Sequence, residues 1–91
     1  MVMTGTTYRT ETAVDVLAGA VAECFVVALG HRKAGRERRA AYLSAAALVD
    51  VTASDELRGA AIASLPWPER AFVKLTGALW LVLACRAARL A

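Results

Sequence analysis

An all-α fold of four helices is predicted from this sequence by three observations. Apolar residues recur at intervals of three and four along most of the chain, which is the spacing of one face of an α-helix. No stretch has the alternation with a period of two that predicts a strand, and no Asn-Gly or Asp-Gly hairpin turn occurs. Capping residues, glycines and prolines divide the chain into helices at about 12–29, 36–51, 55–64 and 68–89. We therefore expect a compact helical bundle.

The first two helices are predicted from a cap and two apolar faces. Thr12, with Asp15 three residues later, approximates a capping box that starts the first helix. Its apolar face consists of Val14, Leu17, Ala18, Val21, Phe25, Ala28 and Leu29. Gly30 is suited to the position just after that helix. A turn over residues 30–35 leads to the second helix, whose apolar face includes Tyr42, Leu43, Ala46, Ala47 and Val49.

The third helix and the start of the fourth are predicted from serine and proline. Ser54 can cap the third helix, and the acidic residues that follow it suit the positive end of the helix dipole. Its buried face is expected to hold Leu57, Ala60, Ala61 and Leu65. Pro66 ends this helix, and Pro68 at the first helical position begins the last one.

The last predicted helix, 68–89, is apolar nearly all round. Phe72, Leu75, Leu79, Val82, Leu83 and Arg86 share one side, while Val73, Trp80 and Leu81 lie on the other. A helix of this kind must be surrounded by its own bundle or by a second copy. Exposing two or three large side chains is costly, since burying each contributes about 1.5–3 kcal/mol. The sequence thus favours a homodimer packed through this helix, with a monomer as the alternative.

Length and composition indicate one domain over residues 1–91, with 1–9 as a loose N-terminal arm. Cys24 and Cys85 lie within apolar helical patterns, so they are predicted to be reduced core residues in a cytoplasmic protein. The uncharged run 75–85 rises only about 17 Å as a helix, too little for a hydrocarbon core of about 30 Å. The first residues lack the charge pattern of a signal peptide.

The sequence favours a protein without catalysis, metal or cofactor. A single histidine, His31, excludes paired-histidine metal sites, and no C-x-x-C spacing accompanies Cys24 and Cys85. Neither a glycine-rich phosphate loop nor a G-x-S-x-G nucleophile turn is present. Cys24 precedes His31 by two helical turns, about 10 Å along the axis, which is too far for a catalytic pair. We therefore predict that the protein is not an enzyme.

A basic cluster is the densest charged feature of the chain. It comprises Arg32, Lys33, Arg36, Arg38 and Arg39. It has three interpretations: a solvated turn that complements the C-terminal end of the first helix, a set of phosphate contacts, or a docking site for an acidic protein or an anionic lipid. No aromatic or amide side chain lies beside it to read bases, so nucleic-acid binding here would be non-specific.

The segment 57–72 contains Leu57-Arg58, Ala61, Leu65-Pro66 and Glu69-Arg70-Ala71-Phe72. In these residues it resembles the opening of the C-terminal domain of extracytoplasmic sigma factors. The DNA-reading helix that follows in that family has no counterpart here, because residues 76–85 are apolar. No functional residue of the family is therefore assigned to this chain.

These observations together predict a non-catalytic interaction or regulatory module that binds another protein, itself, or both. The aromatic residues Trp67, Phe72 and Trp80 are the expected partner contacts, because aromatic side chains dominate binding hot spots. Core packing is the alternative role for all three. A small nucleic-acid-associated regulator that uses the basic residues between 32 and 39 is the second hypothesis. A cationic helical protein at a membrane surface is the third.

Overall fold

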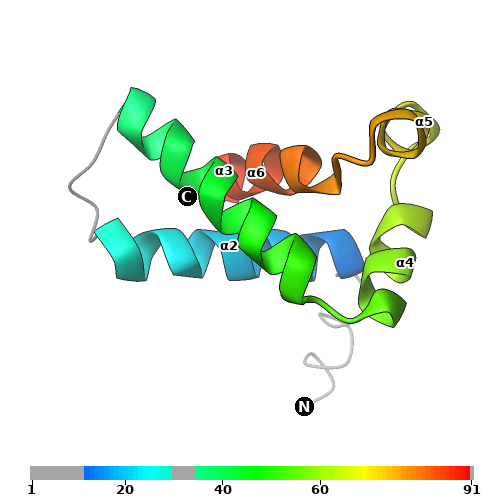
Figure 1. Ribbon diagram of the computed structural model, residues 1–91, viewed down its shortest axis with the longest axis horizontal. Helices are drawn as coiled ribbons and strands as arrows, with labels where there is room; N and C mark the ends of the chain where they lie inside the picture. Colours follow the sequence, from blue (N-terminus) through cyan, green and yellow to red (C-terminus); the bar gives the residue numbers. More distant parts are fainter. Residues whose placement is uncertain (1–11, 30–34, 91) are drawn as a thin grey trace, which may run out of the picture.

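Five α-helices make up the part of the chain that the computed structural model describes, residues 12–29 and 35–90 (Figure 1). They are α2 (Ala13–Leu29), α3 (Arg36–Thr52), α4 (Asp55–Ala63), α5 (Trp67–Thr76) and α6 (Leu79–Leu90). These residues form no strand, so the predicted all-α class is confirmed. The predicted N-terminal arm, the cap at Gly30 and most of the 30–35 turn lie outside the described residues.

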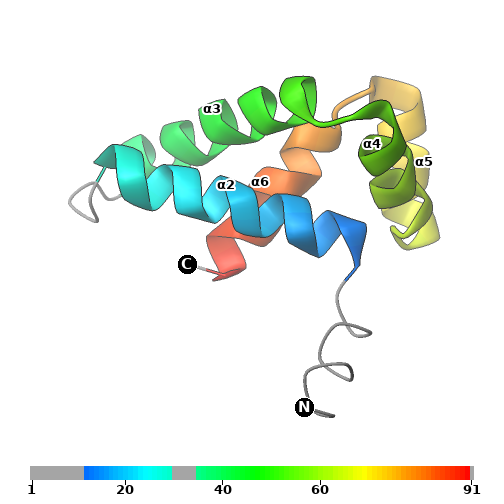
Figure 2. The same cartoon turned by 90° about the horizontal axis from the view of Figure 1, so that it is seen from below.

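The core lies where α2, α3 and α6 pack on one another. α4 contacts α2, and α5 follows α4, so this pair of short helices occupies one end of the molecule (Figures 1 and 2). The largest side chains with almost no exposure are Val14 and Val21 of α2 and Leu79 and Leu83 of α6. A stacked aromatic pair joins α2 to α3, with the ring centroids of Phe25 and Tyr42 4.4 Å apart. No helix among the described residues is long and apolar enough to cross a membrane.

Two predicted helix starts are confirmed by their hydrogen bonds. The Asp15 backbone N–H donates to Thr12 Oγ1 at 3.3 Å, and that hydroxyl donates to Asp15 Oδ2 at 3.0 Å. The Leu57 backbone N–H donates to Ser54 Oγ at 3.1 Å at the start of α4. Both side chains satisfy donors that lack partners in the first turn of a helix.

The single last helix predicted over 68–89 is wrong, because the chain breaks at Gly77 into α5 and α6. Gly77 has φ +72°, a left-handed conformation that glycine adopts without strain. The Thr76 hydroxyl stabilises the break by donating to the Phe72 carbonyl at 2.7 Å and accepting from the Ala78 N–H at 3.2 Å. The start also differs slightly, since α5 begins at Trp67 and Pro68 is its second residue.

The break changes which residues of this segment face the core. α6 buries Leu79, Val82, Leu83, Ala84 and Ala87 against its own chain, while Cys85 and Arg89 are exposed on its other side. α6 is therefore not apolar all round, and most of its large apolar side chains are already covered by α2 and α3. In α5 only Val73 is buried, whereas Phe72 and Leu75 are exposed.

Both cysteines are exposed, so their predicted place in the core is wrong. Successive helical residues are rotated by about 100°, which puts Cys85 on the side of α6 opposite Leu83 and Ala87. Cys24 lies at the edge of the buried stripe of α2, where solvent reaches it. Neither cysteine takes part in a disulfide among the described residues, and their reduced state stays a prediction.

Candidate functional site

The outward face of α5 is the main apolar surface feature that this fold presents. It is made by five side chains on one side of the helix: Trp67, Pro68, Ala71, Phe72 and Leu75. Trp67 is 72% exposed and Leu75 is 87% exposed, while Phe72 is 38% exposed. Because Val73 lies on the opposite side and is buried, α5 turns its larger apolar surface away from the core. This grouping of exposed apolar residues makes the face a candidate interaction site.

Local sequence explains why α5 stands in this orientation. Pro66 separates it from α4, and the left-handed Gly77 separates it from α6. The Arg70 guanidinium donates to the carbonyl of Ala63 at 3.3 Å, which connects α5 to the end of α4. Glu69 faces Arg86 of α6, with 3.5 Å between Oε1 and Nη2. These polar contacts occupy the inner side of α5 and leave the apolar side to solvent.

The three predicted partner-binding residues do not share one surface. Trp67 and Phe72 lie on the outward face of α5. Trp80 lies on α6, where it is half-buried and packs against the hydrophobic core. The third large apolar side chain on the outward face of α5 is Leu75 instead of Trp80. The sequence pattern places Leu75 on the same side as Leu79 and Val82.

The described part of the basic cluster lies in the first turns of α3. Arg36, Arg38 and Arg39 are exposed there, while Arg32 and Lys33 lie outside the described residues. The guanidinium carbon of Arg38 is 5.9 Å from the centre of the Phe25 ring, a cation–π contact that fixes it beside the stacked pair. Among the described residues no side chain caps the N-terminus of α3, which begins after Gly35. The first turn holds one acidic residue, Glu37, beside the three arginines, so a net positive charge remains next to this positive helix end and suits an anion.

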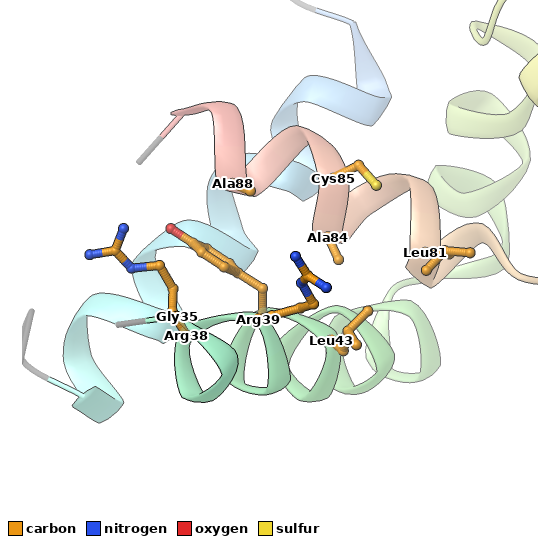
Figure 3. A pocket seen from close by; sticks show the side chains of 9 residues that line it. Gly35, Arg38, Arg39, Leu43, Leu81, Ala84, Cys85 and Ala88 are labelled. Carbon is orange, nitrogen blue, oxygen red and sulfur yellow. The ribbon is translucent and has the colours of Figure 1, made fainter. Parts of the chain in front are cut away.

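A groove of about 500 Å³ runs between the first half of α3 and the side of α6 that carries residues 81–88 (Figure 3). Gly35, Arg38, Arg39, Tyr42 and Leu43 line it from the α3 side, and Leu81, Ala84, Cys85 and Ala88 from α6. The small Ala84 and Ala88 side chains leave space between the two helices. Tyr42 is buried, and no group in the described part of the chain pairs with its hydroxyl.

A second polar cluster connects three helices at the other side of α6. Arg86 Nη1 donates to Asp15 Oδ1 of α2 at 3.0 Å, and its Nη2 faces Glu69 of α5. The single positive charge of the arginine lies between the two carboxylates and is shared by them, which indicates a structural link between helices rather than an acid–base pair. In the ranges 12–29 and 35–90, no group of histidine, cysteine or acidic side chains is arranged to hold a metal ion.

No protein-family model, no curated protein and no solved structure matches this chain. Its function is therefore argued from the two surfaces above, the outward face of α5 and the groove between α3 and α6.

Proposed function

We propose that this protein is a non-catalytic interaction module of the cytoplasm that pairs with a second copy of itself through the outward face of α5. The observation that carries this proposal is the orientation of α5, which exposes Trp67, Phe72 and Leu75 and buries only Val73. The predicted dimer contact along 68–89 is thereby assigned to the α5 half of that segment. The α6 half packs against α2 and α3 of the same chain.

Symmetry supports a second copy as the partner. In a twofold dimer the same surface meets itself, so one apolar helix face is sufficient to form an interface. Two such faces would cover each other's aromatic and leucine side chains in the manner of packed helices. Trp67 and Phe72 are the types of residue that contribute most to such contacts.

The size of the surface sets the expected affinity. A helix of ten residues is about 15 Å long, and five of its side chains form the face. Standard stable interfaces use about 20–30 residues on each side. We therefore expect a reversible dimer with a dissociation constant in the micromolar range or weaker.

Sedimentation velocity over a concentration series from low micromolar to millimolar tests the proposal. The unmodified chain should shift from monomer to dimer across the series. Leu75→Ser should weaken the dimer about tenfold or more, because it removes an apolar contact at the centre of the face. Val27→Ser is the matched control, since Val27 is 85% exposed on α2 and should leave dimerisation unchanged.

Two outcomes would contradict the proposal. One is a chain that stays monomeric at millimolar concentration. The other is a dimer that Val27→Ser weakens as much as Leu75→Ser does, because the contact would then not be specific to α5.

A further inference from the structure

The groove between α3 and α6 combines an apolar floor with a positive end. At one end, Gly35 and Arg38 of α3 lie opposite Ala88 of α6 (Figure 3). At the other end, Leu43 faces Leu81. Its volume of about 500 Å³ is in the range of about 300–1,000 Å³ that is typical of small-molecule sites. The groove is therefore large enough for a small ligand and differs in polarity from one end to the other.

The charges around the groove select for an anion. Two arginines, Arg38 and Arg39, line it, and none of the described lining residues is acidic. The uncapped N-terminus of α3 lies at the same end as Arg38 and adds the positive end of a helix dipole. Arginine side chains hold carboxylate groups by paired hydrogen bonds. The positive end is thus suited to one anionic head group.

The Tyr42 hydroxyl is a second, independent feature of this groove, because it is a buried polar group that the described residues leave unpaired. The side chain of Tyr42 lines the groove and is only 3% exposed, yet its hydroxyl has no hydrogen-bond partner among residues 12–29 and 35–90. Buried hydroxyl groups are normally paired. A hydroxyl that adjoins a groove is therefore available to a polar group of a ligand there.

We propose that this groove binds a single-chain fatty carboxylate. The carboxylate lies at the Gly35 end of the groove, where Arg38 is placed, and Arg39, which points toward Ala84, adds positive charge next to it (Figure 3). The acyl chain runs past Ala84 toward Leu43 and Leu81. This site is separate from the outward face of α5 and does not depend on the proposed dimer. A nucleic-acid phosphate could use the arginines but would leave the apolar part of the groove empty.

Calorimetric titration with decanoate, below the concentration at which it forms micelles, tests the proposal on the full chain. We expect saturable one-to-one binding, with little or none for acetate, which lacks the tail, and for decanol, which lacks the charge. The double variant Arg38→Ala/Arg39→Ala should weaken decanoate binding at least tenfold. Arg36→Ala is the matched control, because Arg36 is exposed in the same turn but does not line the groove, and it should bind normally.

The two exposed cysteines give a second readout within the same molecule. Cys85 lines the groove and Cys24 does not, although both are free and exposed. Decanoate should slow alkylation of Cys85 severalfold, as measured by peptide mass spectrometry, and leave Cys24 unchanged. Ala88→Trp, which fills the groove from an exposed position of α6, should abolish both this protection and the binding heat.

Three results would overturn the proposal. The first is the absence of saturable decanoate binding. The second is equal protection of Cys24 and Cys85, which would indicate non-specific adsorption. The third is binding of a single-stranded oligonucleotide or of anionic vesicles that requires Arg38 and Arg39 when monomeric decanoate does not bind, since this would assign the arginines to a nucleic acid or a membrane instead.

Discussion

Asp50 is a buried carboxylate in the last turn of α3, a position where the negative end of the helix dipole disfavours an anion. Arg58 of α4 compensates for this, because its Nε donates to Asp50 Oδ1 at 3.1 Å. Arg58 also lies 3.6 Å from Asp55 in its own helix. The pair Asp50–Arg58 therefore fixes α4 against the end of α3 and decides where the α4–α5 end of the molecule lies.

Removing Arg58 alone should destabilise the fold more than removing both partners. Arg58→Ala leaves Asp50 without its counter-charge, and we expect a loss of about 2 kcal/mol in the free energy of unfolding. This is less than the about 3–5 kcal/mol for breaking a fully buried pair, because the Arg58 side chain is 41% exposed. The double variant Asp50→Ala/Arg58→Ala should recover part of the loss. Urea unfolding followed by circular dichroism measures each value, and strictly additive single losses would contradict the coupling.

Gly77 and Gly59 show how one substitution can have opposite effects in two elements. Gly77 has a left-handed conformation between α5 and α6, whereas Gly59 lies within α4, and neither has an atom within 4 Å of an added Cβ. Gly77→Ala should therefore destabilise the protein by about 1–2 kcal/mol through backbone strain. Gly59→Ala should stabilise it by about 0.5–1 kcal/mol through helix propensity.

Thermal unfolding followed at 222 nm compares these two variants directly. Gly77→Asn adds a control, because asparagine tolerates the left-handed region and should lose less stability than alanine. A stability gain for Gly77→Ala would mean that α5 and α6 can join into one helix, and it would contradict the break described here.

The break at Gly77 separates the helices that the sequence predicts correctly from the two that it predicts as one. Capping side chains and apolar spacing predicted α2, α3 and α4 to within one residue at most ends, because these signals are local. Gly77 was not recognised as a break, since a glycine within an apolar run is compatible with a helix until tertiary packing favours the turn. A continuous helix then placed Leu75 with Leu79, and the exposed position of Leu75 was missed.

The sequence predicts part of the outward face of α5 but not the groove between α3 and α6. Trp67 and Phe72 could be proposed as contacts because aromatic residues beside a proline break are visible in the sequence. The groove could not be proposed from the sequence, because it forms where α3 meets α6, between residues about forty positions apart in the chain. Neither Ala84 nor Ala88 carries a functional signal in the sequence, and they matter only through the space they leave opposite Arg38 and Tyr42.

At the scale of the whole molecule, α5 is the least enclosed helix of the described fold. α2, α3 and α6 bury one another, while α5 contributes only Val73 to the buried core and packs mainly beside α4. Helices with few buried apolar contacts open locally at a lower free energy than the rest of a fold. A partner that covered the apolar face of α5 would also hold this helix in place, so the proposed dimer should stabilise α5.

Hydrogen exchange measured by mass spectrometry at two protein concentrations tests this link. At low micromolar concentration the amides of α5 should exchange about tenfold or more faster than those of α6, because α5 opens without disrupting the core. At millimolar concentration the dimer should slow exchange in α5 alone. Leu75→Ser should remove that concentration dependence and Val27→Ser should retain it, since only Leu75 lies on the α5 face. Equal protection of α5 and α6 in the dilute protein would contradict the weak attachment of α5, and slowing that spreads over all five helices would place the contact between copies elsewhere.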